Sequence, residues 1–180
     1  MSEASDTFSQ SIQDAENLLE HFNSLNTNPP PPETEVLKRA GLVMAMTAWE
    51  TYVEDRLQEA VAERLAGLSD SDVARFMQKK LDEEIKRLHN PDSKRTIELF
   101  HDYAGVDLKT AWSWNNHDPK TVTTKLNGLI KLRGDVVHRS RKVISGPPEP
   151  DPVTKAGLEK AINFLKSLVD ATERAFELSP

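Results

Sequence analysis

A chain of 180 residues is long enough for one helical domain with its own core and short for two. The absence of cysteine excludes disulfides, thiolate metal sites and a cysteine nucleophile, and favours a reducing compartment. The formal net charge of -6 argues against nonspecific coating of nucleic acid, because that binding is driven by positive charge. With only 7 glycines and few β-branched runs, the composition favours an all-α protein over a sheet.

The N-terminal segment, residues 1–7, is polar and acidic, and we expect it to be disordered. It lacks the basic and apolar regions of a secretory signal. No apolar run in the sequence approaches the roughly 18 residues that a membrane span requires. We therefore expect a cytoplasmic protein that does not enter a membrane.

Apolar side chains at three- and four-residue steps predict three helices in the first half of the chain, over residues 8–25, 33–66 and 70–88. A proline-rich linker at residues 28–32 separates the first two, because proline cannot continue a helix. The apolar stripe of the third helix includes Val73 and Phe76, which we expect to face the core.

The second half of the chain is predicted to add a short helix from Ser93, a helix opened by Asp118-Pro119 and ending between residues 138 and 142, and a last helix over residues 151–178. The stretch 106–117 is expected to be irregular. Its two tryptophans, Trp112 and Trp114, more often pin such a loop to the core than stack on bases. With a second proline-rich linker at residues 145–152, the prediction is one domain over residues 8–180, a bundle of five to six helices.

Positive charge gathers in one segment, from Lys120 to Lys142. This segment holds seven basic residues and one acidic residue, Asp135, so its local charge is +6 and the remainder of the chain carries -12. The basic residues are Lys120, Lys125, Lys131, Arg133, Arg139, Arg141 and Lys142.

Arg133 and His138 are the candidate functional pair within this segment. Arg133 lies on the apolar side of its own helix, four residues after Leu129 and four before Val137. Because a guanidinium keeps its proton, a semi-buried arginine needs an anion, and either Glu50 or a phosphate would serve. His138 follows about 140° round the helix. The two side chains converge only in a wide groove, at a distorted helix end, or in a site that a second subunit completes.

Glu50 shares a helical stripe with Val43 and Leu57, so its carboxylate is not expected to be freely solvated. Two interpretations stay open. Glu50 is bonded to a backbone group or a core tyrosine or tryptophan, or it orients a catalytic arginine or histidine.

These residue types can cleave RNA without a metal. A histidine takes the proton from a ribose 2′-hydroxyl or gives one to the leaving 5′-oxygen, while an arginine holds the phosphate. Lys131, Arg139, Arg141 and Lys142 would guide the RNA backbone to the pair. The alternative is a helix end whose cations favour the helix dipole. No histidines or carboxylates stand at metal-ligand spacing, so no metal site and no cofactor is expected.

Two stretches resemble the HEPN superfamily, in particular its RiboL-PSP-HEPN branch. They are Arg133-Gly-Asp-Val-Val-His138, which is similar to the family's Arg and His motif late in the chain, and Ala48-Trp-Glu-Thr-Tyr52 in a long early helix. The resemblance implies a dimeric, metal-independent endoribonuclease of toxin or phage-defence type. Arg133 and His138 would be catalytic and Glu50 and Asp135 supporting, and an antitoxin or a nucleotidyltransferase-like protein is the partner that such a toxin would have.

One position departs from the family pattern. Active members commonly have a polar residue, often asparagine, directly after the motif arginine, where this chain has Gly134. The sequence therefore leaves open a noncatalytic module that binds RNA, a nucleotide or a protein through the same cleft. A purely structural bundle is the third possibility.

Overall fold

The computed structural model describes residues 2–25, 27, 30–31, 33–68, 71–138 and 151–178. Within these ranges the protein is all-helical and contains no strand, although Trp114 and His117 form an isolated β-bridge. Its helices are α1 (Glu3–Leu25), α2 (Glu35–Leu65), the 3-10 helix η1 (Ala66–Leu68), α3 (Asp72–Ile85), α4 (Ser93–Ala104), α5 (Leu108–Ala111), α6 (Pro119–His138) and α7 (Lys155–Glu177).

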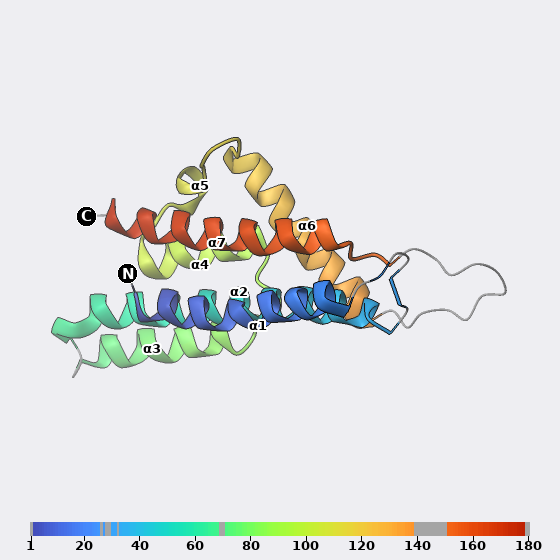
Figure 1. The fold of residues 1–180 in the computed structure, drawn as a ribbon. Helices are drawn as coiled ribbons and strands as arrows, with labels where there is room; N and C mark the ends of the chain where they lie inside the picture. Colours follow the sequence, from blue (N-terminus) through green and yellow to red (C-terminus); the bar gives the residue numbers. More distant parts are fainter. Residues whose placement is uncertain are drawn as a thin grey trace.

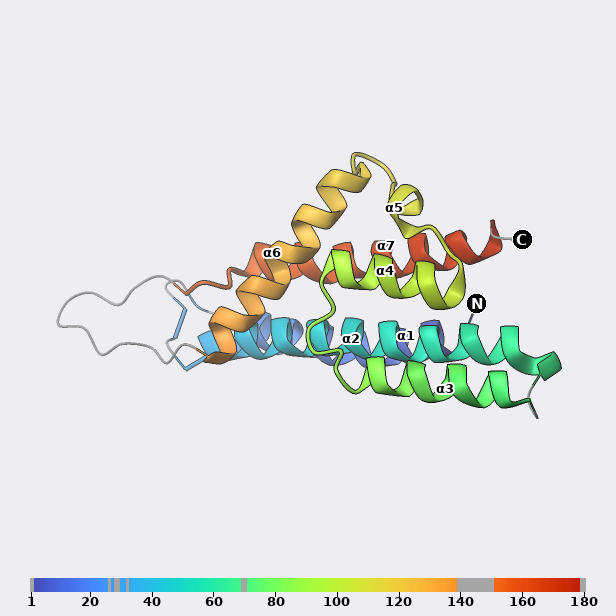
Figure 2. The same cartoon turned by 180° about the vertical axis from the view of Figure 1, so that it is seen from behind.

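The helices form two layers that α6 joins obliquely (Figure 1). One layer holds the antiparallel pair α1 and α2, with α3 along the outer side of α2, and the other holds α4 and α7. An aromatic cluster fills the centre: Trp49 contacts Tyr52 and Trp112, and Tyr52 contacts Phe8, with ring centroids 5.8 to 6.3 Å apart. Seen from behind, α6 starts above α4 and crosses the molecule to the end where α1 ends and α2 begins (Figure 2).

The expectation that residues 1–7 are disordered is wrong for residues 2–7, because α1 begins at Glu3. Ala4 and Phe8 lie one turn apart on the buried face of this helix. The Ser2 hydroxyl accepts from the Ser5 N–H (3.1 Å), and the Glu59 carboxylate of α2 accepts from the Glu3 N–H (3.0 Å). The first turn is thus held by a contact with a residue far along the chain, which a local pattern cannot reveal.

The structure has seven α-helices in its described ranges, where the sequence predicted five to six in all. The additional element is α5, a single turn inside the stretch expected to be irregular, capped by the Asp107 carboxylate, which accepts from the Lys109 N–H (2.9 Å). The expectation that tryptophan pins this stretch to the core is confirmed for Trp112, which is fully buried with its N–H donating to the Thr172 hydroxyl (3.0 Å).

The prediction that Val73 and Phe76 face the core is also wrong, since they are 63% and 59% exposed. The inward residues of α3 are Ala74 and Leu81. In this arrangement α3 packs along one side of α2 (Figure 2), so one narrow stripe is buried and the neighbouring apolar positions face solvent.

Parts of both proline-rich linkers, residues 28, 29 and 32 and residues 145–150, lie outside the described residues. Among the helices that are described, none combines the length and the apolar character needed to cross a membrane.

Candidate functional site

The site is carried by α6, whose start is fixed by Asp118 and Pro119. The Asp118 carboxylate accepts from the Thr121 N–H (2.8 Å), and hydrogen bonds from Thr121 lower the pKa of Asp118 below its ordinary value. Pro119 suits the first helical position, where no N–H is needed. The fully buried residues of α6 are Val122 and Leu126, both in its first half. The second half, which carries the candidate residues, therefore lies less deeply in the bundle.

Arg133 is half-buried, and its Nε atom is buried without a hydrogen-bond partner in the part of the chain that the structure describes. No ion pair of Arg133 is found there either. A guanidinium is always charged, so a buried donor without an acceptor costs free energy unless a ligand supplies one. The fold thus leaves one N–H of Arg133 out of water and without an acceptor from the described residues.

His138 is the last residue of α6 and is exposed. Because α6 is continuous to this residue, a distorted helix end does not bring the two side chains together. Five residues of regular helix separate Arg133 and His138 by about 140° in angle and about 7.5 Å along the axis. Lys131 is exposed and lies about two turns before His138, so these two share a face that Arg133 does not.

Glu50 contacts a backbone group. Its Oε1 accepts from the Asn90 N–H (2.9 Å), in a turn where Asn90 has a left-handed backbone, with φ of 54°. Within the described chain the structure records no hydrogen bond or ion pair between Glu50 and Arg133. Of the two interpretations left open by the sequence, this contact favours the structural one, and a supporting role for Glu50 stays a proposal.

Glu54 was not singled out by the sequence, although it stands one turn after Glu50 on α2. Burial first, and then the negative charge of Glu50, raise the pKa of Glu54 above its ordinary value of 4.5, while His89 opposes the shift. The spacing of four residues was the available signal, because like charges one helical turn apart repel.

Of the remaining candidate residues, the structure describes one and leaves out three. Asp135 is half-buried on α6, two residues after Arg133. Arg139, Arg141 and Lys142 lie outside the described residues, so the prediction that they bind RNA stays a prediction.

The second half of α6 keeps an apolar face that the rest of the described chain covers incompletely. Val137 is 47% exposed, and four further residues are only partly buried against the core: Leu129, Ile130, Leu132 and Val136. Leu25, the last residue of α1, and Val36, near the start of α2, are also exposed. These helix ends lie at the same end of the bundle as the end of α6 (Figures 1 and 2).

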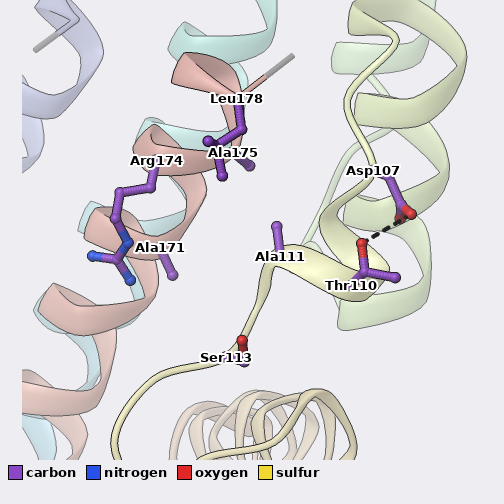
Figure 3. Close-up of a pocket in the computed structure, with 8 residues that line it drawn as sticks. All are labelled: Asp107, Thr110, Ala111, Ser113, Ala171, Arg174, Ala175 and Leu178. Carbon is purple, nitrogen blue, oxygen red and sulfur yellow. Dashed lines mark hydrogen bonds between the residues drawn. The ribbon is translucent and has the colours of Figure 1, made fainter.

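A cavity of about 490 Å³ lies elsewhere, between α5 and the last turns of α7 (Figure 3). Ala171 and Ala175 of α7, and Leu178 directly after this helix, face Ala111 of α5 across the cavity. The Asp107 carboxylate accepts from the Thr110 hydroxyl at its rim (3.1 Å). None of the predicted site residues lines this cavity. The candidate pair on α6 therefore lies outside this cavity.

Fold and site together describe an all-helical bundle in which α6 carries an arginine and a histidine five residues apart. The family described as RiboL-PSP-HEPN matches residues 10–178, nearly the whole chain, and the protein belongs to that family. Comparisons with curated proteins and with solved structures gave no match. Membership of this family indicates a nuclease or an RNA-binding module.

Proposed function

We propose that the protein is a metal-independent endoribonuclease of the toxin or phage-defence type, with Arg133 and His138 acting in a composite site between two copies of the chain. The observation that carries the proposal is the buried Arg133 Nε, which has no acceptor in the described chain. A phosphate oxygen is the acceptor that a guanidinium binds best, since it matches both charge and geometry. The +6 segment from Lys120 to Lys142 supports the choice of an RNA backbone as the anion.

The reaction follows from the two side chains. Neutral His138 takes the proton from a ribose 2′-hydroxyl, and the 2′-oxygen forms a bond to the neighbouring phosphorus. The bond from phosphorus to the 5′-oxygen breaks, and the leaving oxygen takes a proton from water, while His138 later gives its proton to the hydroxide that remains. Arg133 stabilises the additional negative charge on the phosphate. The products are a 2′,3′-cyclic phosphate and a 5′-hydroxyl.

Two observations support a dimer. In one copy, the regular helix separates Arg133 and His138 by about 140°. The partly covered apolar residues of α6, with Val137 at their end, are also the kind of surface that a second copy would bury. Pairing two copies along α6 would bring an arginine from one chain towards a histidine from the other.

The direct test is RNA cleavage by purified protein in the presence of EDTA. We expect cleavage with 2′,3′-cyclic phosphate ends, and we expect His138→Ala to reduce the rate by at least about 100-fold, as for loss of a general base or acid. Arg133→Lys keeps the charge and should still lose most activity, because lysine lacks the planar fork. Lys94→Ala on α4, where the lysine is exposed, is the matched control. Cleavage that survives His138→Ala would contradict the assignment.

Toxicity is tested separately by induction in cells. We expect growth arrest with the wild type and none with His138→Ala at equal expression. Normal growth with the wild type, together with RNA cleavage by the purified protein, would contradict the toxin role and leave the nuclease intact.

A second candidate function is noncatalytic RNA binding. It is favoured by Gly134, which stands where active members of the family commonly have a polar residue. Among the described residues, and apart from its own helix backbone, no heavy atom lies within 4 Å of a Cβ atom added at Gly134, so these residues leave room there for a side chain. This candidate predicts RNA binding that weakens with salt, no cleavage and no growth arrest. Gly134→Asn would then be the variant to examine for gained cleavage.

A further inference from the structure

The three tryptophans of the chain have different surroundings. Trp49 and Trp112 are fully buried, and their N–H groups donate to the Pro91 carbonyl (3.4 Å) and the Thr172 hydroxyl (3.0 Å). Trp114 is only half-buried, and within the described residues its indole N–H has no hydrogen-bond partner. Trp49 and Trp112 are therefore enclosed by the core, whereas Trp114 stays partly exposed.

Trp114 belongs to a tight turn that stacks two rings. The backbone N–H of Trp114 donates to the His117 carbonyl (3.0 Å), and the Trp114 carbonyl accepts from the backbone N–H of His117 (2.7 Å). Asn116, inside the turn, is in the left-handed region at φ of 62°. This closure places the His117 ring on the indole, with centroids 5.0 Å apart and an angle of 21° between planes. Phe164 of α7, which is buried, supports both rings at 5.7 and 6.1 Å.

A lysine of α6 completes this cluster. Lys125 Nζ donates to His117 Nε2 (2.7 Å), and His117 Nδ1 donates to the Asn115 carbonyl (3.1 Å), so both ring nitrogens are engaged and the ring is held in one orientation. The ammonium group of the exposed Lys125 thus lies beside the stacked rings. An aromatic surface with a cation at its edge is the combination that binds single-stranded nucleic acid, through base stacking and a phosphate contact.

Helix α6 carries both Lys125 of this cluster and the candidate catalytic pair, Arg133 and His138. Lys125 stands eight residues before Arg133 on α6, or about 12 Å along the helix axis. The turn lies directly before the start of α6, at the top of the view in Figure 1. A bound strand could therefore contact both places.

We propose that Trp114, His117 and Lys125 form a second RNA-binding subsite, on which one base of a single-stranded RNA stacks while Lys125 binds an adjoining phosphate. The subsite rests on the proposed function, because it holds the substrate of that same reaction away from the bond that is cut. Its residues position RNA and do not take part in the chemistry.

Fluorescence titration tests the subsite without any need for cleavage. A mixed-sequence single-stranded RNA oligonucleotide should quench the tryptophan emission of the full-length protein. Trp114→Phe should lose most of this quenching and keep the fold, because phenylalanine retains ring packing and the other two tryptophans are buried. Quenching that persists in Trp114→Phe, or equal quenching by duplex RNA of the same sequence, would overturn the proposal.

Measurements of RNA affinity and of cleavage kinetics test the subsite in a second way. The double variant His117→Ala with Lys125→Ala should bind the oligonucleotide roughly tenfold more weakly, whereas Lys94→Ala should bind as the wild type does. In cleavage, the double variant should raise KM for the oligonucleotide with kcat unchanged, and KM for a dinucleotide should not change. Wild-type affinity in the double variant would show that the stack only anchors the loop. If the wild type does not cleave but the binding differences appear, the nuclease proposal fails and the subsite stands.

Discussion

Glu50 holds the turn before α4 through one hydrogen bond, in which its carboxylate accepts from the Asn90 N–H. Asn90 has a positive φ, which costs free energy that this bond helps to offset. We expect Glu50→Ala to lower the free energy of unfolding by about 1 kcal/mol in urea titration and to leave RNA cleavage intact below the unfolding transition. Unchanged stability with lost cleavage would instead show that Glu50 acts on Arg133.

Glu54, one helical turn after Glu50 on α2, leads to a prediction about how the stability of the protein depends on pH. Its pKa is raised in the folded protein, chiefly by burial and then by Glu50, so the folded state holds this proton more tightly than the unfolded chain does. Its contribution to stability is therefore complete below pH 4.5 and is lost as the pH rises through the raised value. We expect Glu54→Gln to increase the unfolding midpoint at pH 7 and to have little effect at pH 4, measured by thermal unfolding. A stabilisation that is equal at both pH values would contradict the assigned cause.

At the residue scale, the sequence predicted which side chains are unusual but not what they contact. Arg133 was identified because helical spacing places it among apolar residues, and it is half-buried. The partner of Glu50 is a backbone group 40 residues away, presented by a left-handed asparagine. No periodic pattern encodes such a turn, so this contact could not be predicted.

At the scale of elements, α3 offers a matched pair of substitutions. Leu81 is fully buried against the core, whereas Phe76, five residues earlier and about 140° round the same helix, is largely exposed. We expect Leu81→Ala to lower the free energy of unfolding by about 2 to 5 kcal/mol and Phe76→Ser to change it by less than about 0.5 kcal/mol. Similar losses for both, measured in urea, would contradict the orientation of α3.

Helix positions were largely predictable, since proline, glycine and capping residues mark most of the breaks. The two departures have different causes. The first turn of α1 is fixed by Glu59 of α2, and α5 is one turn long and held by Asp107. Elements of that kind depend on tertiary contacts or local capping more than on a repeated apolar pattern.

At the scale of the whole molecule, the sequence indicated an amphipathic bundle but not its layers. The apolar stripe of a helix shows which of its faces is buried, but it does not show which other helix covers that face. For this reason the oblique course of α6, which leaves its second half partly uncovered, appears only in the structure (Figure 2). That incompletely covered surface is the one that we propose a second copy of the chain would bury.

We propose that Arg133 of one copy works with His138 of the other, and complementation between two inactive variants examines that pairing. Arg133→Ala and His138→Ala are each expected to be inactive. When the two are unfolded together and refolded, mixed dimers contain one intact pair shared between the chains. We predict that RNA cleavage returns in the mixture and is absent from either variant refolded alone. A mixture that forms mixed dimers and stays as inactive as its components would contradict the composite site.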